Sequence, residues 1–168
     1  MGAVFRVDRA YHPALGRPVR GPPGPGERLR GRPTDRERPM TAPFTHLNLD
    51  DVKDAAPANG FGDRWEARVA RGPLGATATG VTHFRLKPGR RSPFTHRHLE
   101  AEEVYVILGG RGRMKLDDAV IDVGPLDAIR VAPHTARAFE AGDEGLEFIA
   151  VGPHVPGDGR PVADAWTA

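Results

Sequence analysis

Short runs of β-forming residues, separated by turn residues, fill most of the chain from residue 65 onward. They recur about every eight to twelve residues, a spacing typical of β-sandwiches and barrels rather than of parallel α/β sheets. The expected strands are 65–71, 76–87, 94–98, 103–108, 111–116, 119–123, 127–131, 135–140 and 146–152. A short helix is expected within 47–55, with Asn48 or Asp50 as its N-cap. The sequence therefore predicts an all-β domain with little helix.

Turn residues separate the expected strands. Asp117 and Asp118 predict a tight hairpin between the strands on either side of them. The glycines of "LGGRGR" (108–113) join two strands and lead into no helix, so we interpret them as hairpin residues and not as a phosphate-binding loop. "AGDEG" (141–145) predicts another turn, and the final stretch from residue 153 is expected to be irregular.

The first part of the chain differs in composition from the rest. Residues 1–39 carry nine arginines and four acids, a net charge of +5, which leaves −3 for the remaining residues. Proline and glycine are frequent there and a periodic apolar pattern is missing, so we predict a disordered leader over 1–40, with translation from Met40 as the leading alternative. The domain is expected over 41–168, with its core barrel at about 65–152.

Composition and charge limit the classes of function. The chain has no cysteine, which excludes thiolate metal sites, disulfides and thiol nucleophiles. The high overall pI comes from the leader, so it does not indicate that the domain binds nucleic acid. The longest apolar runs fall far short of a membrane span, which takes about 18 residues. We therefore expect a cytoplasmic protein that binds a small molecule and interacts with neither nucleic acid nor membrane.

The stretch "FTHRHLEAEEVYVILGG" (94–110) carries the strongest chemical signal. His96 and His98 are two residues apart, so on a strand both side chains point to the same face. A carboxylate from the next strand, Glu103 or alternatively Glu102, would complete three ligands. Two histidines and one carboxylate suit Fe, Mn, Ni or Zn and leave coordination positions open.

These residues resemble the first motif of the cupin superfamily, G-x5-H-x-H-x(3,4)-E-x6-G. Gly89 precedes His96 by one residue more than that pattern has, whereas Glu103 and Gly110 fit its spacing. The resemblance covers about residues 75–152 and implies a double-stranded β-helix, or jelly-roll, barrel. It also implies a divalent metal held by His96, His98 and Glu103, and often a homodimer.

The second cupin motif matches less well. Aligning "VAPHTARAFEAG" with it puts His134 at a glycine position and Arg137 at the place of the fourth metal ligand. Arginine stays protonated and offers no lone pair. Three outcomes stay open: three protein ligands bind the metal while Arg137 holds an anionic substrate group, Arg137 pairs with Glu103 in place of the ion, or His134 supplies the missing ligand.

Three further residues are candidates for lining the ligand pocket. Tyr105 and Phe139 alternate in step with Glu103 and Arg137, so they would face the interior as core or as pocket residues, and His83 lies on the preceding strand. The favoured function is a metal-dependent protein, such as an oxygenase or isomerase, that binds a small anionic ligand near Arg137. The alternative is a metal-free binding or sensing module, and a storage role is a weaker third hypothesis.

Overall fold

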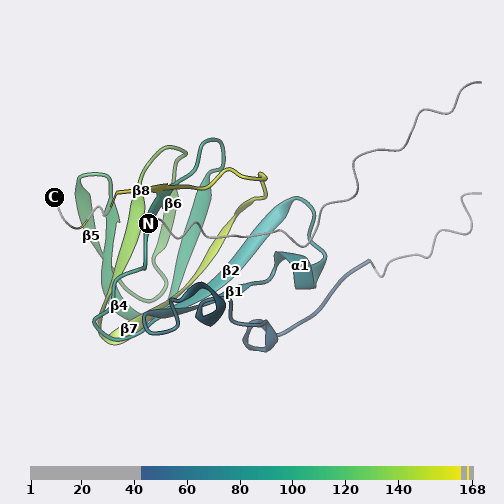
Figure 1. Ribbon diagram of the computed structural model, residues 1–168, viewed down its shortest axis with the longest axis horizontal. Coiled ribbons are helices and arrows are strands. Elements are labelled where there is room, and N and C mark those ends of the chain that lie inside the picture. Colours follow the sequence, from purple (N-terminus) through teal and green to yellow (C-terminus); the bar gives the residue numbers. More distant parts are fainter. Residues whose placement is uncertain (1–42, 164–165, 167–168) are drawn as a thin grey trace, which may run out of the picture. The chain divides into compact units, whose positions relative to one another are not determined.

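The computed structural model describes residues 43–163 and 166, and the predicted leader therefore lies outside the described residues. Eight strands and three short helical turns are present within them (Figure 1). The all-β prediction is confirmed. The elements are η2 (Leu49–Asp51), η3 (Pro57–Asn59), β1 (Trp65–Val69), α1 (Arg71–Leu74), β2 (Thr79–Leu86), β3 (Thr95–Arg97), β4 (Glu103–Leu116), β5 (Ala119–Val123), β6 (Ala128–Val131), β7 (Arg137–Pro153) and β8 (Arg160–Val162).

The strands form one curled antiparallel sheet with β7 at its centre (Figure 1). One path runs β1-β2-β7-β3-β8, and β4 joins β7 along nearly its whole length while also pairing with β5 and β6. Since β7 pairs with β2, β3 and β4, it brings segments far apart in sequence next to one another. Among the described residues, no helix combines the length and apolar character needed to pass through a bilayer.

The hairpin predicted at Asp117 and Asp118 is confirmed, since Leu116 pairs with Ala119 across this two-residue loop. Asp117 has a φ of 49°, in the left-handed region that such tight turns require. The N-cap expected at Asn48 is also present, where its side chain accepts a hydrogen bond from the Asp50 amide. It caps the 3-10 turn η2 rather than an α-helix.

The predicted hairpin at the glycines of residues 108–113 is wrong, because β4 runs through them. The pairing of β4 with β7 shifts register there, and the two backbones approach closely. A Cβ on Gly110 would lie 2.1 Å from the Gly145 carbonyl oxygen, and one on Gly112 would lie 2.2 Å from that of Glu140. These glycines therefore permit a close crossing inside a strand rather than a turn.

Two other expectations from the sequence also need correction. The turn expected at 141–145 is instead part of β7, whose bend is absorbed at Gly145 with a φ of 83°. The last stretch is not wholly irregular, because β8 forms within it and pairs with β3. In both cases long-range pairing overrides a local turn signal, as tertiary contacts commonly do.

An aromatic cluster fills the space that the curled sheet encloses. Phe148 stacks on Phe139 with ring centroids 4.2 Å apart, and Phe84 stacks on Trp65 at 4.8 Å. Phe84 also contacts Phe148 at 5.1 Å, so the rings form one continuous core. Tyr105 lies 5.1 Å from Phe139 at the end of this core that faces the histidines.

Candidate metal centre

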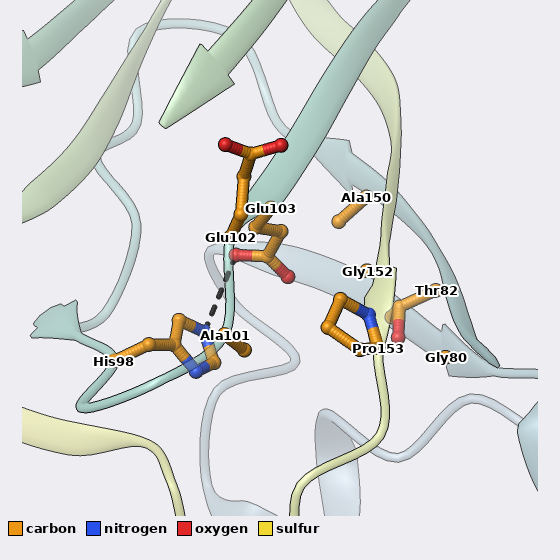
Figure 2. A pocket seen from close by; sticks show the side chains of 9 residues that line it. All are labelled: Gly80, Thr82, His98, Ala101, Glu102, Glu103, Ala150, Gly152 and Pro153. Atoms are coloured by element: carbon orange, nitrogen blue, oxygen red, sulfur yellow. Dashed lines mark ion pairs between the residues drawn. The ribbon is translucent and has the colours of Figure 1, made fainter. Parts of the chain in front are cut away.

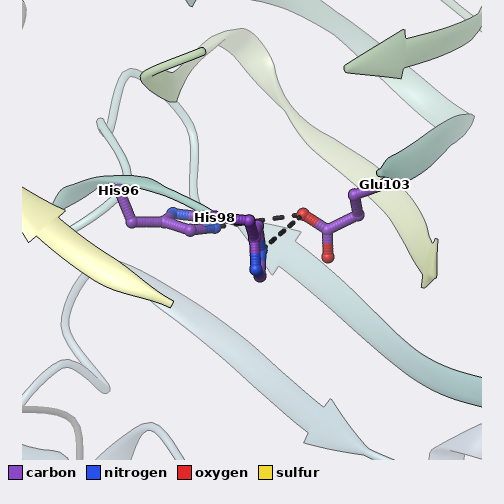
Figure 3. Close-up of side chains that lie close together, drawn as sticks. All are labelled: His96, His98 and Glu103. Atoms are coloured by element: carbon purple, nitrogen blue, oxygen red, sulfur yellow. Dashed lines mark ion pairs between the residues drawn. The ribbon is translucent and has the colours of Figure 1, made fainter. Parts of the chain in front are cut away.

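The short strand β3, the loop after it and the start of β4 bring the predicted metal ligands together. His96 is in β3, His98 follows β3 directly, and Glu103 is the first residue of β4. The three side chains each offer a ligand atom, and these atoms all lie within 4.8 Å of one another (Figure 3). The structure therefore brings together the set that the sequence spacing indicated.

One oxygen of Glu103 faces both imidazoles. Its Oε2 lies 3.4 Å from His98 Nε2 and 3.9 Å from His96 Nε2. The His98 Nε2 atom is buried and has no hydrogen-bond partner among the residues that the structure describes. A buried polar atom without a partner is costly, and this nitrogen faces a carboxylate oxygen across 3.4 Å.

The other nitrogen of His98 is firmly held. Its Nδ1 lies 2.7 Å from Asp158 Oδ2, and the Asp158 side chain is 3% exposed. The same carboxylate accepts hydrogen bonds from three consecutive amides, those of residues 99, 100 and 101. The loop that carries His98 is thus tied to the C-terminal segment.

Arg137 lies behind Glu103 and is completely buried. Its Nη2 donates to Glu103 Oε2 at 3.1 Å, its Nε donates to the Tyr105 hydroxyl at 3.2 Å, and its Nη1 donates to the Thr135 carbonyl at 3.0 Å. The Tyr105 hydroxyl in turn donates a short hydrogen bond to Glu103 Oε2. Arg137 therefore supplies the positive charge that a buried carboxylate needs.

These contacts set the protonation states of the cluster. Burial raises the pKa of Glu103, but the contacts with His96, His98 and Tyr105 outweigh burial and hold this pKa well below its usual value. Burial lowers the pKa of His96, which favours the neutral ring. Burial also raises the pKa of Tyr105 well above its usual value, so its hydroxyl stays a donor. Glu103 is ionised and His96 is neutral, the forms in which both bind metals.

The alternatives weighed from sequence lie elsewhere. Glu102 pairs with Arg130 at 2.6 Å and is not among the clustered ligand atoms. The His134 side chain is exposed, while its backbone amide donates to the His98 carbonyl at 2.8 Å. Its φ of 70° fits the glycine position with which it was aligned.

The family model described as a cupin domain matches residues 82–152. Those residues form a cupin domain. The resemblance seen in the sequence is confirmed, and so is the fold that it implied.

Solved structures share the fold of this cupin. A polyketide cyclase, RemF, from Streptomyces resistomycificus is 25% identical with a TM-score of 0.59, over 71% of this chain and 85% of that one. A sugar phosphate isomerase of the cupin superfamily from Silicibacter pomeroyi is 22% identical with a TM-score of 0.60, over 71% and 82%. A cupin protein from Bacteroides fragilis is 21% identical with a TM-score of 0.56, over 70% and 89%.

Among curated proteins, the uncharacterized protein MJ1618 of Methanocaldococcus jannaschii is 42% identical over 45 residues. The match spans 27% of this chain and 36% of that protein's length. It therefore supports a shared segment and says nothing about the activity of the whole chain.

A depression of about 70 Å³ opens beside His98 and Glu103 (Figure 2). Small residues dominate its wall, and the lining residues are Gly80, Thr82, His98, Ala101, Glu102, Glu103, Ala150, Gly152 and Pro153. The Glu102 carboxylate turns away from the His98 ring, whereas that of Glu103 faces it (Figure 2). This wall leaves room for a small molecule next to the candidate ligands.

The other pocket candidates do not line this depression. Tyr105 and Phe139 are 2% and 4% exposed and pack into the aromatic core. His83 is buried on the opposite face of its strand from Phe84, where its Nε2 lies 2.7 Å from Glu147 Oε1. Arg137 is enclosed behind Glu103, so its NH groups reach the depression only through that carboxylate.

Sequence reasoning missed Asp158. It belongs to neither cupin motif and lies in "PGDG", which is ordinary turn chemistry. Its approach to His98 depends on β8 pairing with β3, a contact between residues about sixty positions apart. An aspartate in a glycine-rich turn near the end of a chain is too common to be singled out by its pattern.

Proposed function

We propose that this cupin domain binds one divalent metal ion through His96, His98 and Glu103. The observation that carries the proposal is the buried Nε2 of His98, which lacks a hydrogen-bond partner within the described part of the chain and faces the Glu103 carboxylate. A cation between these atoms satisfies both of them at once. Imidazole and carboxylate ligands suit Fe, Mn, Ni and Zn.

The spacing of the ligand atoms supports this proposal. Two atoms bound to the same ion at about 2.1 Å stand roughly 3 to 3.5 Å apart at bond angles near 90° to 110°. The distance from Glu103 Oε2 to His98 Nε2 is 3.4 Å, within that interval, and the distance to His96 Nε2 is 3.9 Å, slightly beyond it. The His96 side chain is 27% exposed, and a small rotation of its ring would bring Nε2 within that interval.

The charge of the site favours an anionic ligand. Arg137 and Glu103 cancel each other, so a divalent ion would leave a net charge of about +2 in a partly buried site. An anion in the neighbouring depression would lower the energy of that arrangement. Arg137 favours anion binding because it neutralises the charge of Glu103. Direct contact between Arg137 and the ligand stays a prediction.

The residues around the depression indicate which chemistry is feasible. A bound divalent ion supplies a Lewis acid that polarises an oxygen of the ligand. The Tyr105 hydroxyl stays protonated and orients Glu103, while Thr82 offers a hydroxyl on the opposite wall. An oxygenase- or isomerase-type reaction on a small anionic molecule fits these features, and the fold is shared with a polyketide cyclase.

A metal-free binding module is the second candidate. The hydrogen bond of 3.1 Å from Arg137 to Glu103 favours it, because this pair already neutralises the carboxylate. In that case His98 would carry a second proton, placed between Nε2 and Glu103. The two candidates therefore differ in what fills the space between His98 and Glu103, an ion or a proton.

Metal titration of the full chain, purified without a histidine tag, tests the proposal. We expect uptake of one ion per chain from Fe²⁺, Mn²⁺, Ni²⁺ or Zn²⁺, and loss of that uptake in His96→Ala and His98→Ala. His83→Gln is the matched control, since His83 is also buried beside a glutamate but outside the cluster. Failure of the wild-type protein to take up any of the four metals would refute the proposal.

Two properties expected from the sequence stay predictions. A homodimer and a cytoplasmic location follow from the cupin resemblance and from the composition. Sedimentation of the purified full chain would check the first of them, with a mass of twice 18.1 kDa expected.

A further inference from the structure

The carboxylate of Asp158 makes four contacts, all with the segment that carries His98. Its Oδ1 accepts from the amides of Leu99 and Glu100 at 2.9 and 2.8 Å. Its Oδ2 accepts from the amide of Ala101 at 3.2 Å and lies 2.7 Å from His98 Nδ1. Asp158 is 5% exposed, so water competes little for these contacts.

These contacts decide which nitrogen of His98 carries a proton. An ionised carboxylate only accepts hydrogen bonds, so Nδ1 must donate to Asp158. In the neutral ring the lone pair then lies on Nε2, the atom that faces Glu103. A ring fixed in this way cannot donate from Nε2 to the carboxylate, but it can bind a cation.

We propose that Asp158 is a positioning residue, which fixes the tautomer and the orientation of His98 so that Nε2 is presented to a metal ion. The part of this proposal that concerns the ion rests on the proposed function. Hydrogen bonds of this kind raise the basicity of a histidine ligand, and their loss typically costs roughly 10- to 100-fold in metal affinity.

The strand β8 explains how Asp158 reaches the site. Thr95 pairs with Val162 and His96 with Pro161, so β8 lies along the strand that carries the first histidine. The chain turns at Gly157, with a φ of 67°, immediately before Asp158. The C-terminal segment thus completes a site whose candidate ligands come from β3, the loop after it and β4.

One substitution can separate two roles of Asp158, which are to hold the loop at residues 99–101 and to fix the proton on the His98 ring. In Asp158→Asn the remaining oxygen can still accept from the amides of Leu99 and Glu100, as Oδ1 does in the wild type. The amide nitrogen of asparagine can only donate, so it would face the Ala101 amide and the ring as a donor. His98 Nδ1 would then become an acceptor and the proton would move to Nε2.

The first test is made on the wild-type full chain without metal, by nitrogen-15 NMR of the His98 ring at about pH 8, where unperturbed imidazoles are neutral. We expect a proton on Nδ1 and none on Nε2. A neutral ring with its proton on Nε2 would overturn the proposal. This measurement involves no metal, so it can be made even if the wild-type chain takes up no ion.

The second test compares Zn²⁺ affinity in Asp158→Asn and in Asp54→Asn. Asp54 Oδ1 accepts from the amides of Ala56 and Ala67 at 2.9 Å each, so it is a matched carboxylate that holds backbone. We expect roughly 10- to 100-fold weaker binding for Asp158→Asn, with the ring proton on Nε2, and no change for Asp54→Asn. Unchanged affinity in Asp158→Asn, or an equal loss in both variants, would overturn the positioning role. Absence of Zn²⁺ binding in the wild type would count against the proposed function alone, and the NMR result would still decide the tautomer.

Discussion

Two histidine–glutamate pairs lie on opposite faces of the same sheet, and they differ in how close their atoms come. On the outer face His83 Nε2 lies 2.7 Å from Glu147, which also accepts from Arg85 at 3.0 Å. On the inner face His98 Nε2 lies 3.4 Å from Glu103 and makes no hydrogen bond with any described residue. The outer pair is a completed hydrogen bond, whereas the inner pair leaves a space that fits a cation.

The inner pair is also braced in a way that the outer pair is not. Asp158 holds the far nitrogen of His98, and Arg137 and Tyr105 donate hydrogen bonds to Glu103 Oε2, the oxygen that faces the histidines. The far nitrogen of His83, its Nδ1, is buried without a hydrogen-bond partner in the described part of the chain. Metal ligands are usually held in place by hydrogen bonds to neighbouring residues. These contacts therefore distinguish the candidate site at His98 and Glu103 from the structural pair of His83 and Glu147.

The largest expected effect distinguishes the two histidines by their metal affinity. His98→Ala should weaken Zn²⁺ binding by more than about 100-fold, because it removes one of three ligands. His83→Gln should leave the affinity unchanged. Isothermal titration of the two variants checks this prediction, and equal affinities would mean that the inner histidine is no ligand.

The next effect concerns the charge that balances Glu103. Arg137→Met should lower the free energy of unfolding by about 3–5 kcal/mol, because it leaves a buried carboxylate without its partner. Added metal should restore part of that stability, since the ion supplies the missing charge. Urea denaturation with and without Zn²⁺ measures both effects.

Arg113→Met is the matched control for Arg137→Met. Arg113 also pairs with a glutamate, Glu140, but its side chain is 48% exposed. Its loss should cost far less stability than the loss of Arg137, because exposed ion pairs are screened by solvent. A similar cost for both variants would show that Arg137 is no more important than a surface arginine.

A smaller effect is expected for the outer pair. Glu147→Ala leaves the buried Nε2 of His83 without its acceptor and should lower the free energy of unfolding by about 1–3 kcal/mol. Metal affinity should not change, since this pair faces away from the cluster. Thermal unfolding and metal titration of this variant measure the two quantities, and weakened metal binding would contradict the separation of the two faces.

The smallest effect is a change in acid stability. Hydrogen bonds from Arg113 and Arg91 lower the pKa of Glu140 below its usual value. A lowered pKa in the folded state contributes stability that is present above the unfolded pKa, about 4.3, and that is lost as the pH falls through the folded value. Glu140→Gln should therefore lower stability slightly at neutral pH and flatten its decline below about pH 4. Urea midpoints between pH 3 and 7 check this, and an unchanged decline would refute it.

The fold and the ligand cluster follow from local patterns in the sequence. Alternation places His96 and His98 on one face, and the spacing to Glu103 puts the carboxylate at the start of the next strand. These are short-range features, and the structure brings the three side chains together as expected.

The features that were predicted wrongly or missed depend on contacts between distant parts of the chain. The glycines of β4 resemble turn residues, but they are required where β4 crosses β7. Asp158 resembles a surface turn residue, but β8 carries it to His98. No short window of sequence contains the information on either contact.

The most direct measurement is an anomalous-difference map from crystals of the full chain grown with Zn²⁺ and recorded at the zinc edge. We expect one strong peak at coordination distance from His96 Nε2, His98 Nε2 and the Glu103 carboxylate. A map without a peak at that position, or with its main peak beside His83 and Glu147, would contradict the account.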